Sequence, residues 1–217
     1  MKNKMQQVLS AEQIEANYKK AIQIINSFKN EDRKTKLLQL FKDQEDKIMV
    51  APASSSPKFH AAFTGGYLQH TLNVCKFSMA VYDLWKSANA KMDYEKESLL
   101  FCALVHDLGK IGSEEHEYYT ENDSAWHINN RQEYYKINNE VMYMRVQDRS
   151  LWWLQKYNLD ISENEYITIL THDGLFDEGN KSYYMQYDAE RKFRTNMPYV
   201  IHQADVMAMR IEFEMYK

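Results

Sequence analysis

The spacing of apolar residues constrains the fold most, because they recur every three or four positions along much of the chain. Between Tyr67 and Lys86, one such stripe comprises Leu68, Leu72, Cys75, Met79 and Tyr82. This spacing places the apolar side chains on one face of an α-helix. The 217 residues include only 6 glycines and 3 prolines, so few positions interrupt helices. We therefore expect an all-α fold.

The N-terminal region is predicted to form a helical hairpin. Ser10 and Gln13 have the spacing of a capping box, which opens a helix that runs to about Phe28. A second helix is predicted over residues 32–50. The next segment, APASSSPKFHAAFTGG, contains two prolines and ends in Gly-Gly, so it should be irregular. This boundary divides an N-terminal helical extension, residues 1–50, from a helical domain, residues 51–217.

Further helices are predicted over residues 67–86, 94–105, 129–147, 162–172 and 198–216. The second of these is apolar almost throughout from Leu99 to Val105, so it should be central, and Gly109 supplies its stop. Ser162 and Glu165 form a second capping box. The polar loop over residues 174–196 contains SYYMQYD, which is compatible with a small hairpin.

Composition narrows the function. The net charge is −4, from 27 basic and 31 acidic residues, so the chain lacks the positive field that holds a long nucleic acid. A small anionic substrate remains compatible. Cys75 and Cys102 lie in apolar segments without CxxC spacing, and we expect buried free thiols. Without an 18-residue apolar run or a secretory signal pattern, we expect no membrane partner and a cytoplasmic location.

The residues with the clearest chemistry are an adjacent His106 and Asp107 at the end of the predicted central helix. His70 lies one helix earlier, and Asp205 lies in the last helix. Imidazole and carboxylate together suit divalent ions such as Mn, Fe, Ni, Co or Zn, held by ligands that converge from several elements. A buried aspartate beside a buried histidine costs several kcal/mol, roughly, unless a partner or metal compensates it.

The order His, His-Asp, Asp resembles that of the HD-domain phosphohydrolase superfamily, and it is carried by GGYLQHTLNV, LLFCALVHDLGKIG and IHQADVMAMR. The likeness extends to APASSSPKFHAAFTGGYLQHT, YYTENDSAWHINN and ILTHDG, which resemble passages of the YhaM-type 3′→5′ exoribonucleases. It covers about residues 31–210. The chain departs from those enzymes in two places. Its first 50 residues favour helices instead of an OB-fold, and Asp173 stands where the family has a second histidine.

The resemblance implies an HD phosphohydrolase domain whose first divalent ion is held by His70, His106, Asp107 and Asp205. His127 and His172 match the additional histidines of binuclear members, in which Asp107 would bridge the two ions. Such ions lower the pKa of water toward neutrality and clamp the attacking and leaving oxygens. We expect one or two ions, with Mn, Fe, Ni, Co, Zn and Mg all open, and Asp107 and Lys110 as catalytic residues.

Substrate contacts are predicted from Lys110, which can neutralise a phosphate oxygen, and from His60, which matches a family histidine and could equally hydrogen-bond the backbone. Basic residues that either line the rim or form a solvated loop are Lys181, Arg191, Lys192 and Arg194. One or two of four flanking tyrosines are expected to stack a base, namely Tyr118, Tyr119, Tyr134 and Tyr135. His202, on the same helical face as Asp205, permits an outer role or core packing.

These features predict hydrolysis of a phosphoester or phosphoanhydride in a nucleotide, or in a short or cyclic oligonucleotide, by metal-activated water. One alternative is a 3′→5′ exonuclease on single-stranded RNA or DNA, with the N-terminal helices in place of the OB-fold. Another is a non-catalytic nucleotide-sensing HD protein, against which the intact ligand set argues. The amphipathic N-terminal hairpin can pack on its own domain or on a second copy, so a homo-oligomer stays open.

Overall fold

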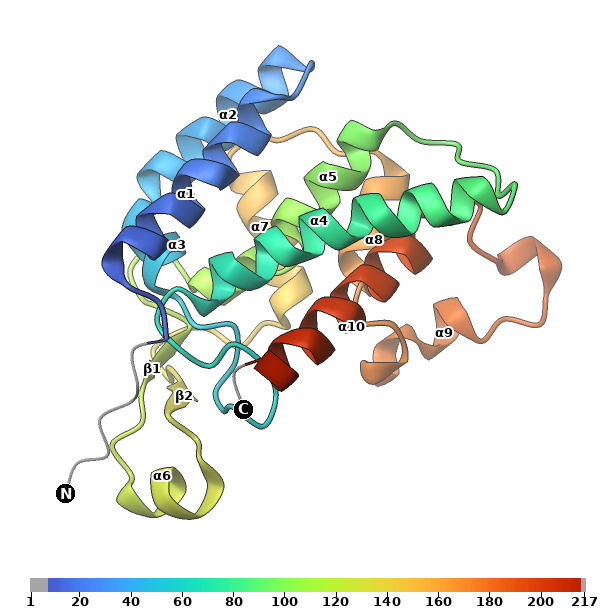
Figure 1. The fold of residues 1–217 in the computed structure, drawn as a ribbon. Helices are drawn as coiled ribbons and strands as arrows, with labels where there is room; N and C mark the ends of the chain where they lie inside the picture. The colour runs from blue at the N-terminus through green and yellow to red at the C-terminus, as the bar shows by residue number, and fades with distance from the viewer. Residues whose placement is uncertain (1–7, 216–217) are drawn as a thin grey trace.

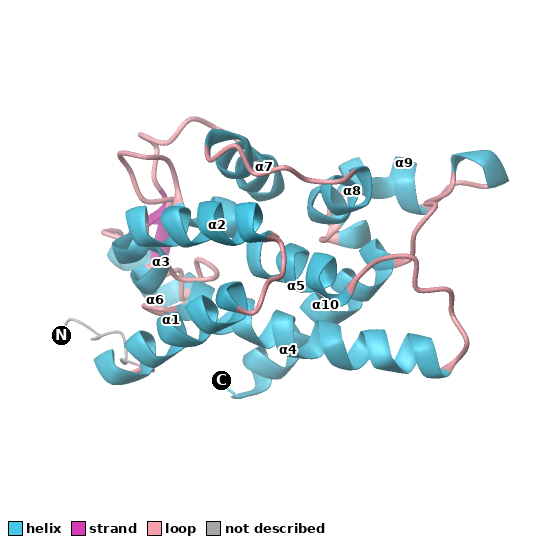
Figure 2. Cartoon of the chain, turned by 90° about the horizontal axis from the view of Figure 1, so that it is seen from above, coloured by secondary structure: helices cyan, strands magenta, loops and turns pink. Residues whose placement is uncertain are grey.

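The regular structure is almost entirely helical (Figures 1 and 2), in a computed structural model that describes residues 8–215. These residues form ten α-helices, short 3-10 helices and one two-stranded antiparallel sheet. The predicted all-α fold is confirmed. None of the helices in the described range combines the length and apolar character needed to cross a bilayer.

The N-terminal helices are α1 (Ala11–Asn26), α2 (Glu31–Asp43) and α3 (Glu45–Val50). The first capping box forms as predicted, because Ser10 accepts from the Gln13 amide while the Gln13 side chain accepts from the Ser10 amide. The single helix predicted over residues 32–50 is wrong in one respect. It breaks at Gln44, whose φ of −111° and ψ of 18° leave the helical region and separate α2 from α3.

The longer helices of the remaining chain are α4 (Gly66–Ser87), α5 (Lys96–Val105), α7 (Val146–Lys156), α8 (Glu163–Thr171) and α10 (Met197–Met215). In Figure 1, α10 runs beside α4, and these two helices contact one another along their length. A single apolar core includes Leu37 of α2, Leu68 of α4, Leu104 of α5 and Trp153 of α7, so the N-terminal helices share it. Tyr216, predicted in the last helix, lies outside the described residues.

The turn after α5 differs from its prediction. The helix ends at Val105, and after His106 and Asp107 the chain continues as a 3-10 helix, η1 (Leu108–Ile111). Gly109 lies within this turn and is therefore not the helix stop. A Cβ there would lie 2.1 Å from the Val146 carbonyl oxygen, so glycine is required for the close approach of α7.

The helix predicted over residues 129–147 is wrong. Residues 119–147 instead form β1 (Tyr119–Glu121), α6 (Ala125–Arg131), β2 (Tyr135–Ile137) and a loop that leads into α7, which begins at Val146. Tyr119 pairs with Ile137 and Thr120 with Lys136, and the hairpin projects from the helical bundle with α6 at its tip (Figure 1). Gln132, in the left-handed conformation with φ 57°, ends α6 and turns the chain back.

The segment between α8 and α10 forms short helical turns, so the small hairpin considered at SYYMQYD is absent from it. The turns are η2 (Gly174–Phe176), η3 (Glu178–Asn180), α9 (Lys181–Tyr184) and η4 (Ala189–Arg191). The Tyr184 hydroxyl donates to the Thr171 carbonyl at 3.1 Å, which ties α9 to the end of α8. Cys75 and Cys102 are buried free thiols, as predicted.

Candidate metal centre

Four helices bring five side chains together in what we call the metal centre, comprising His70, His106, Asp107, His172 and Asp205. His70 lies in α4, His106 and Asp107 follow α5, His172 follows α8, and Asp205 lies in α10. The Nε2 atom of His70 lies 3.0 Å from Asp205 Oδ1. The Nε2 atoms of His106 and His172 lie 3.5 and 3.6 Å from the two oxygens of Asp107. The four ligands predicted for the first ion are thus neighbours.

Two of the histidines have the same local geometry. Each follows the last residue of a helix, and its Nδ1 donates to the carbonyl three residues earlier, Ala103 for His106 and Ile169 for His172, both at 2.8 Å. The last carbonyls of a helix lack intrahelical partners, so they are available as acceptors. Because the carbonyl fixes the proton on Nδ1, Nε2 presents its lone pair to the centre.

A carboxylate orients the third histidine. His70 Nδ1 lies 3.0 Å from Glu212 Oε2, and Asn73 donates to the other oxygen of Glu212 at 2.7 Å. Glu212 is fully buried. The Nε2 atoms of His70 and His106 are both shielded from solvent, and that of His106 makes no hydrogen bond within the described chain. Imidazole nitrogens oriented in this way, beside two carboxylates, fit a divalent metal ion.

The charges of the metal centre compensate one another. Burial lowers the pKa of His70, but Glu212 and Asp205 outweigh burial and raise it to about 10. The same balance raises the pKa of His172 to about 10, through Asp173 and Asp107. Burial raises the pKa of Asp107, yet Lys110 and His106 hold it well below its usual range. Protons on the imidazoles thus supply the positive charge that a metal ion can supply instead.

The side chains fall into overlapping groups whose donor atoms lie within 4.8 Å of one another. They are His60, His70 and Glu212; His70, His106 and Asp205; His106, Asp107 and His172; and His172, Asp173 and Asp205. Asp173, which departs from the family pattern in sequence, contributes a carboxylate 3.6 Å from His172 Nε2. Asp173 and Asp205 are partly exposed, so the centre is not closed to solvent.

Lys110 lies where the sequence predicts it, beside Asp107. Its Nζ is 2.6 Å from Asp107 Oδ2, and its side chain is 11% exposed. Lys110 also lines a cavity of about 300 Å³ together with Thr64, Tyr119 and Tyr135. Two of the four flanking tyrosines therefore line a cavity that also contains Lys110, the partner of Asp107.

His60 lies against His70, with 4.5 Å between the ring centroids. Both ring nitrogens are shielded from solvent and have no hydrogen-bond partner in the described structure. Burial, followed by the proximity of His70, lowers the pKa of His60 well below its usual value, so its ring is neutral. His60, which we predicted to contact the substrate, therefore lies beside the metal centre, and neither of its ring nitrogens forms a hydrogen bond within the described structure.

His127 is not brought into the metal centre. It lies on α6, is partly exposed, and its Nδ1 is 2.5 Å from Glu133 Oε2. Within residues 8–215, no group of potential ligands includes it. Its predicted role in a second ion site is therefore not supported by its position.

The basic residues predicted at the rim lie in the segment around α9, and they are Lys181, Arg191, Lys192 and Arg194. All four are exposed. Lys181 pairs with Glu178 at 2.8 Å and Arg191 with Asp188 at 3.6 Å. These contacts are local to the segment and do not reach the metal centre.

Three supporting residues were not assigned from the sequence: Glu212 and Asn73, which hold His70, and Asp173. Glu212 follows Asp205 by seven residues, which places both on one face of α10, and this spacing is a signal that the sequence does contain. His202, for which an outer role was one interpretation, has its Nδ1 2.8 Å from the His172 carbonyl. It therefore supports the turn that carries His172.

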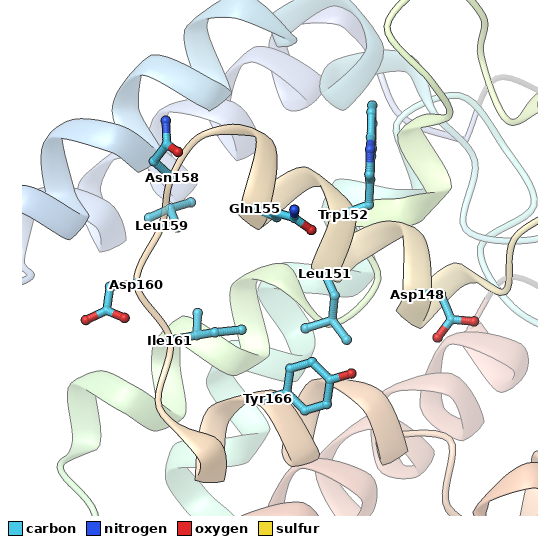
Figure 3. A pocket seen from close by; sticks show the side chains of 9 residues that line it. All are labelled: Asp148, Leu151, Trp152, Gln155, Asn158, Leu159, Asp160, Ile161 and Tyr166. Atoms are coloured by element: carbon cyan, nitrogen blue, oxygen red, sulfur yellow. The ribbon is translucent and has the colours of Figure 1, made fainter.

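A larger groove of about 700 Å³ lies between α7 and α8 (Figure 3). Leu151 of α7 and Tyr166 of α8 face one another across it. Its charged lining residues are Asp148 and Asp160, and none of the lining residues is basic. The groove does not suit an anionic substrate, and the metal centre remains the better functional candidate.

Comparison of the chain with protein-family models, with curated proteins and with solved structures finds no match in any of the three.

Proposed function

We propose that the chain is an HD-type phosphohydrolase that uses one or two divalent ions to cleave a phosphoester or phosphoanhydride of a nucleotide or of a short or cyclic oligonucleotide. The observation that carries this proposal is the convergence of three imidazole Nε2 atoms on Asp107 and Asp205. Hydrogen bonds to the Nδ1 atoms favour ligation through Nε2. The order of these residues in the sequence adds the resemblance to HD phosphohydrolases.

The first ion would be held by His70, His106, Asp107 and Asp205. A second ion would be held by His172, Asp173 and Asp107. The distances from His172 Nε2 to Asp107 and Asp173, each 3.6 Å, support this assignment. In this arrangement Asp173 takes the place that we predicted for His127.

A divalent ion in the centre supplies a Lewis acid that activates water and polarises a phosphoryl oxygen. Hydrolysis then forms a bond from the water oxygen to phosphorus and breaks the bond from phosphorus to the leaving oxygen, which takes up a proton. Lys110 donates to an anionic oxygen of the reacting phosphate, since its ammonium lies between Asp107 and the adjoining cavity. The cavity volume of about 300 Å³ suits a small ligand rather than a folded nucleic acid.

The test is turnover and metal content of the purified protein, measured after chelation and reloading with manganese. Substrates are nucleoside mono- and triphosphates, cyclic nucleotides, dinucleotides and a labelled single-stranded RNA. Asp107→Asn is expected to lose turnover and most of the metal, because Asp107 belongs to the ligand groups. Asp160→Asn is the matched control, since this exposed aspartate lies in the groove between α7 and α8.

Full turnover in Asp107→Asn would contradict the proposal. Stepwise shortening of the RNA, without cleavage of free nucleotides, would favour the exonuclease alternative. A wild-type protein that binds nucleotides but neither retains metal nor turns over any substrate would favour the sensor.

A further inference from the structure

Arg149 of α7 is a buried cation without an anionic partner. Arg149 is 3% exposed, and no carboxylate among residues 8–215 forms an ion pair with it. Nη2 donates to the Met142 carbonyl at 2.5 Å, the guanidinium lies 5.5 Å from the Tyr118 ring centroid, and Nε has no partner. Burying an uncompensated charge costs free energy, so the burial of Arg149 indicates that an anion from outside the chain neutralises the guanidinium.

The guanidinium lines a cavity of about 510 Å³ between Tyr118, the loop over residues 137–144 and α7. Ile137, Met142 and Tyr143 contribute exposed apolar side chains to this lining, and Tyr143 is 90% exposed. We call this cavity the Arg149 pocket. A buried cation beside exposed apolar and aromatic side chains suits an anionic group attached to a planar or apolar body.

The acidic side chain in the pocket lining, Glu140, does not neutralise Arg149. Its Oε2 lies 3.2 Å from His116 Nδ1, and Glu140 is largely exposed. Arg149 is therefore the basic residue in the pocket lining, and Glu140 leaves its charge available to a ligand.

The helix that carries Arg149 contacts the turn that carries His106 and Asp107. Ser150, the next residue of α7, donates to the His106 carbonyl at 2.9 Å and accepts from the Gly109 amide at 2.8 Å. Tyr118 lines the Arg149 pocket and Tyr119 lines the cavity beside Lys110, with 4.8 Å between their ring centroids. The two cavities thus lie on either side of one tyrosine pair.

We propose that the Arg149 pocket binds a second phosphate group of the same substrate whose reacting phosphate lies at Asp107 and Lys110. This inference rests on the proposed function. Guanidinium binds phosphate through paired hydrogen bonds, and Arg149 Nε is free for one of them. The substrate class is accordingly a nucleotide with two separate phosphates, such as a nucleoside bisphosphate or a dinucleotide with a terminal phosphate.

Binding to the metal-free protein tests the inference without turnover. Calorimetric titration with adenosine 3′,5′-bisphosphate, adenosine 5′-monophosphate and inorganic phosphate measures what the second phosphate adds. The wild-type protein is expected to bind the bisphosphate roughly tenfold or more tightly than the monophosphate, since hydrogen bonds to charged groups have this strength. Arg149→Gln is expected to remove that preference, while Lys181→Gln, an exposed basic control, keeps it.

Equal affinity of the wild-type protein for bisphosphate and monophosphate would overturn the inference. Binding of inorganic phosphate that depends on Arg149, without a preference for the bisphosphate, would also overturn the inference. It would indicate that the pocket binds an anion that is not part of the substrate. If Arg149→Gln does not fold, Tyr143→Ala is measured in its place, because the Tyr143 side chain is exposed and its loss should not disturb the core. It should weaken bisphosphate binding severalfold, and an unchanged affinity would contradict the assignment.

Turnover separates this inference from the proposed function. With manganese, Arg149→Gln is expected to raise KM for a 5′-phosphorylated dinucleotide more than it raises KM for a nucleoside monophosphate. If the wild-type protein turned over none of the substrates but still preferred the bisphosphate, the proposed function would be contradicted, and the assignment of the Arg149 pocket as an anion site would stand.

Discussion

Glu212 is the residue of α10 that connects the metal centre to the helical core. Its oxygens have separate partners, His70 Nδ1 at 3.0 Å and the Asn73 amide at 2.7 Å. The carboxylate therefore holds the Nδ1 proton of His70, fixes the ring orientation and increases the basicity of Nε2. Glu212 is fully buried, so this charge is compensated only by groups inside the protein.

Glu212→Gln is expected to weaken metal binding by about 10–100-fold, because outer partners of ligating histidines have effects of this size. The measurement is manganese affinity by calorimetry, with the helical circular dichroism signal as a check on folding. Glu214→Gln is the matched control, since Glu214 lies on the same helix and pairs with Arg210 at the surface. An equal loss of affinity in both variants would assign the effect to overall charge.

At the residue scale, the sequence predicts the candidate metal ligands better than the residues that orient them. His106 and Asp107 are adjacent, so their shared position follows from the chain itself. Glu212 contacts His70 only because α10 packs along α4 in one rotational setting, which the spacing within either helix does not determine. His127 was assigned to the site from its motif, and its distance from the centre follows from the hairpin that carries it.

At the scale of elements, α2 is connected to α8 by a buried ion pair. Arg33 binds both oxygens of Glu165 at 2.7 and 2.9 Å, and its guanidinium stacks 4.3 Å from the Phe101 ring centroid. Glu165 also accepts from the Ser162 amide in the second capping box, which is confirmed. One glutamate thus joins the N-terminal helices to the helix that positions His172.

Arg33→Ala is expected to reduce the free energy of unfolding by about 3–5 kcal/mol, because it leaves the Glu165 carboxylate buried and unpaired. Urea denaturation measures the change. Lys34→Ala removes a neighbouring cation whose partner, Glu31, is exposed, and it should cost about 1 kcal/mol or less. Comparable losses in the two variants would show that burial of the Arg33 pair contributes little.

Elements that depend on neighbouring residues can be predicted from the sequence, whereas elements that depend on contacts between distant segments cannot. Both capping boxes form because their partners lie three residues apart. The strands β1 and β2 pair Tyr119 with Ile137 across α6, a contact between separated segments that a tyrosine-rich run does not reveal. The position of α9 is likewise set by a distant contact, because its Tyr184 donates a hydrogen bond to the end of α8.

At the scale of the whole molecule, the metal centre joins helices that are far apart in the sequence. Its side chains belong to α4, α10 and the residues that follow α5 and α8, so an ion bound there would connect these helices. Without an ion, protonated His70 and His172 offset the charges of Asp107 and Asp205. A metal ion and protons would therefore compete for the same positions.

This competition predicts how the thermal stability depends on pH. The folded pKa values of His70 and His172, about 10, lie above the usual 6.5, so their contribution is complete below pH 6.5 and declines as pH rises toward 10. The pKa values of Asp107 and Asp205 are lowered, so their contribution is lost only as pH falls below the usual value of 3.8. Between pH 6.5 and 8.5, the contribution of His70 and His172 to the stability of the metal-free protein should therefore decline.

Manganese should reverse this trend, because binding requires the deprotonated imidazoles that higher pH favours. The increase in Tm between chelator and a fixed manganese concentration is therefore expected to grow from pH 6.5 to 8.5, as tighter binding stabilises the folded state by mass action. Asp107→Asn should show a smaller increase at every pH, since the ion loses a ligand shared by the predicted sites. An increase that shrinks as pH rises would mean that manganese does not displace the protons of His70 and His172.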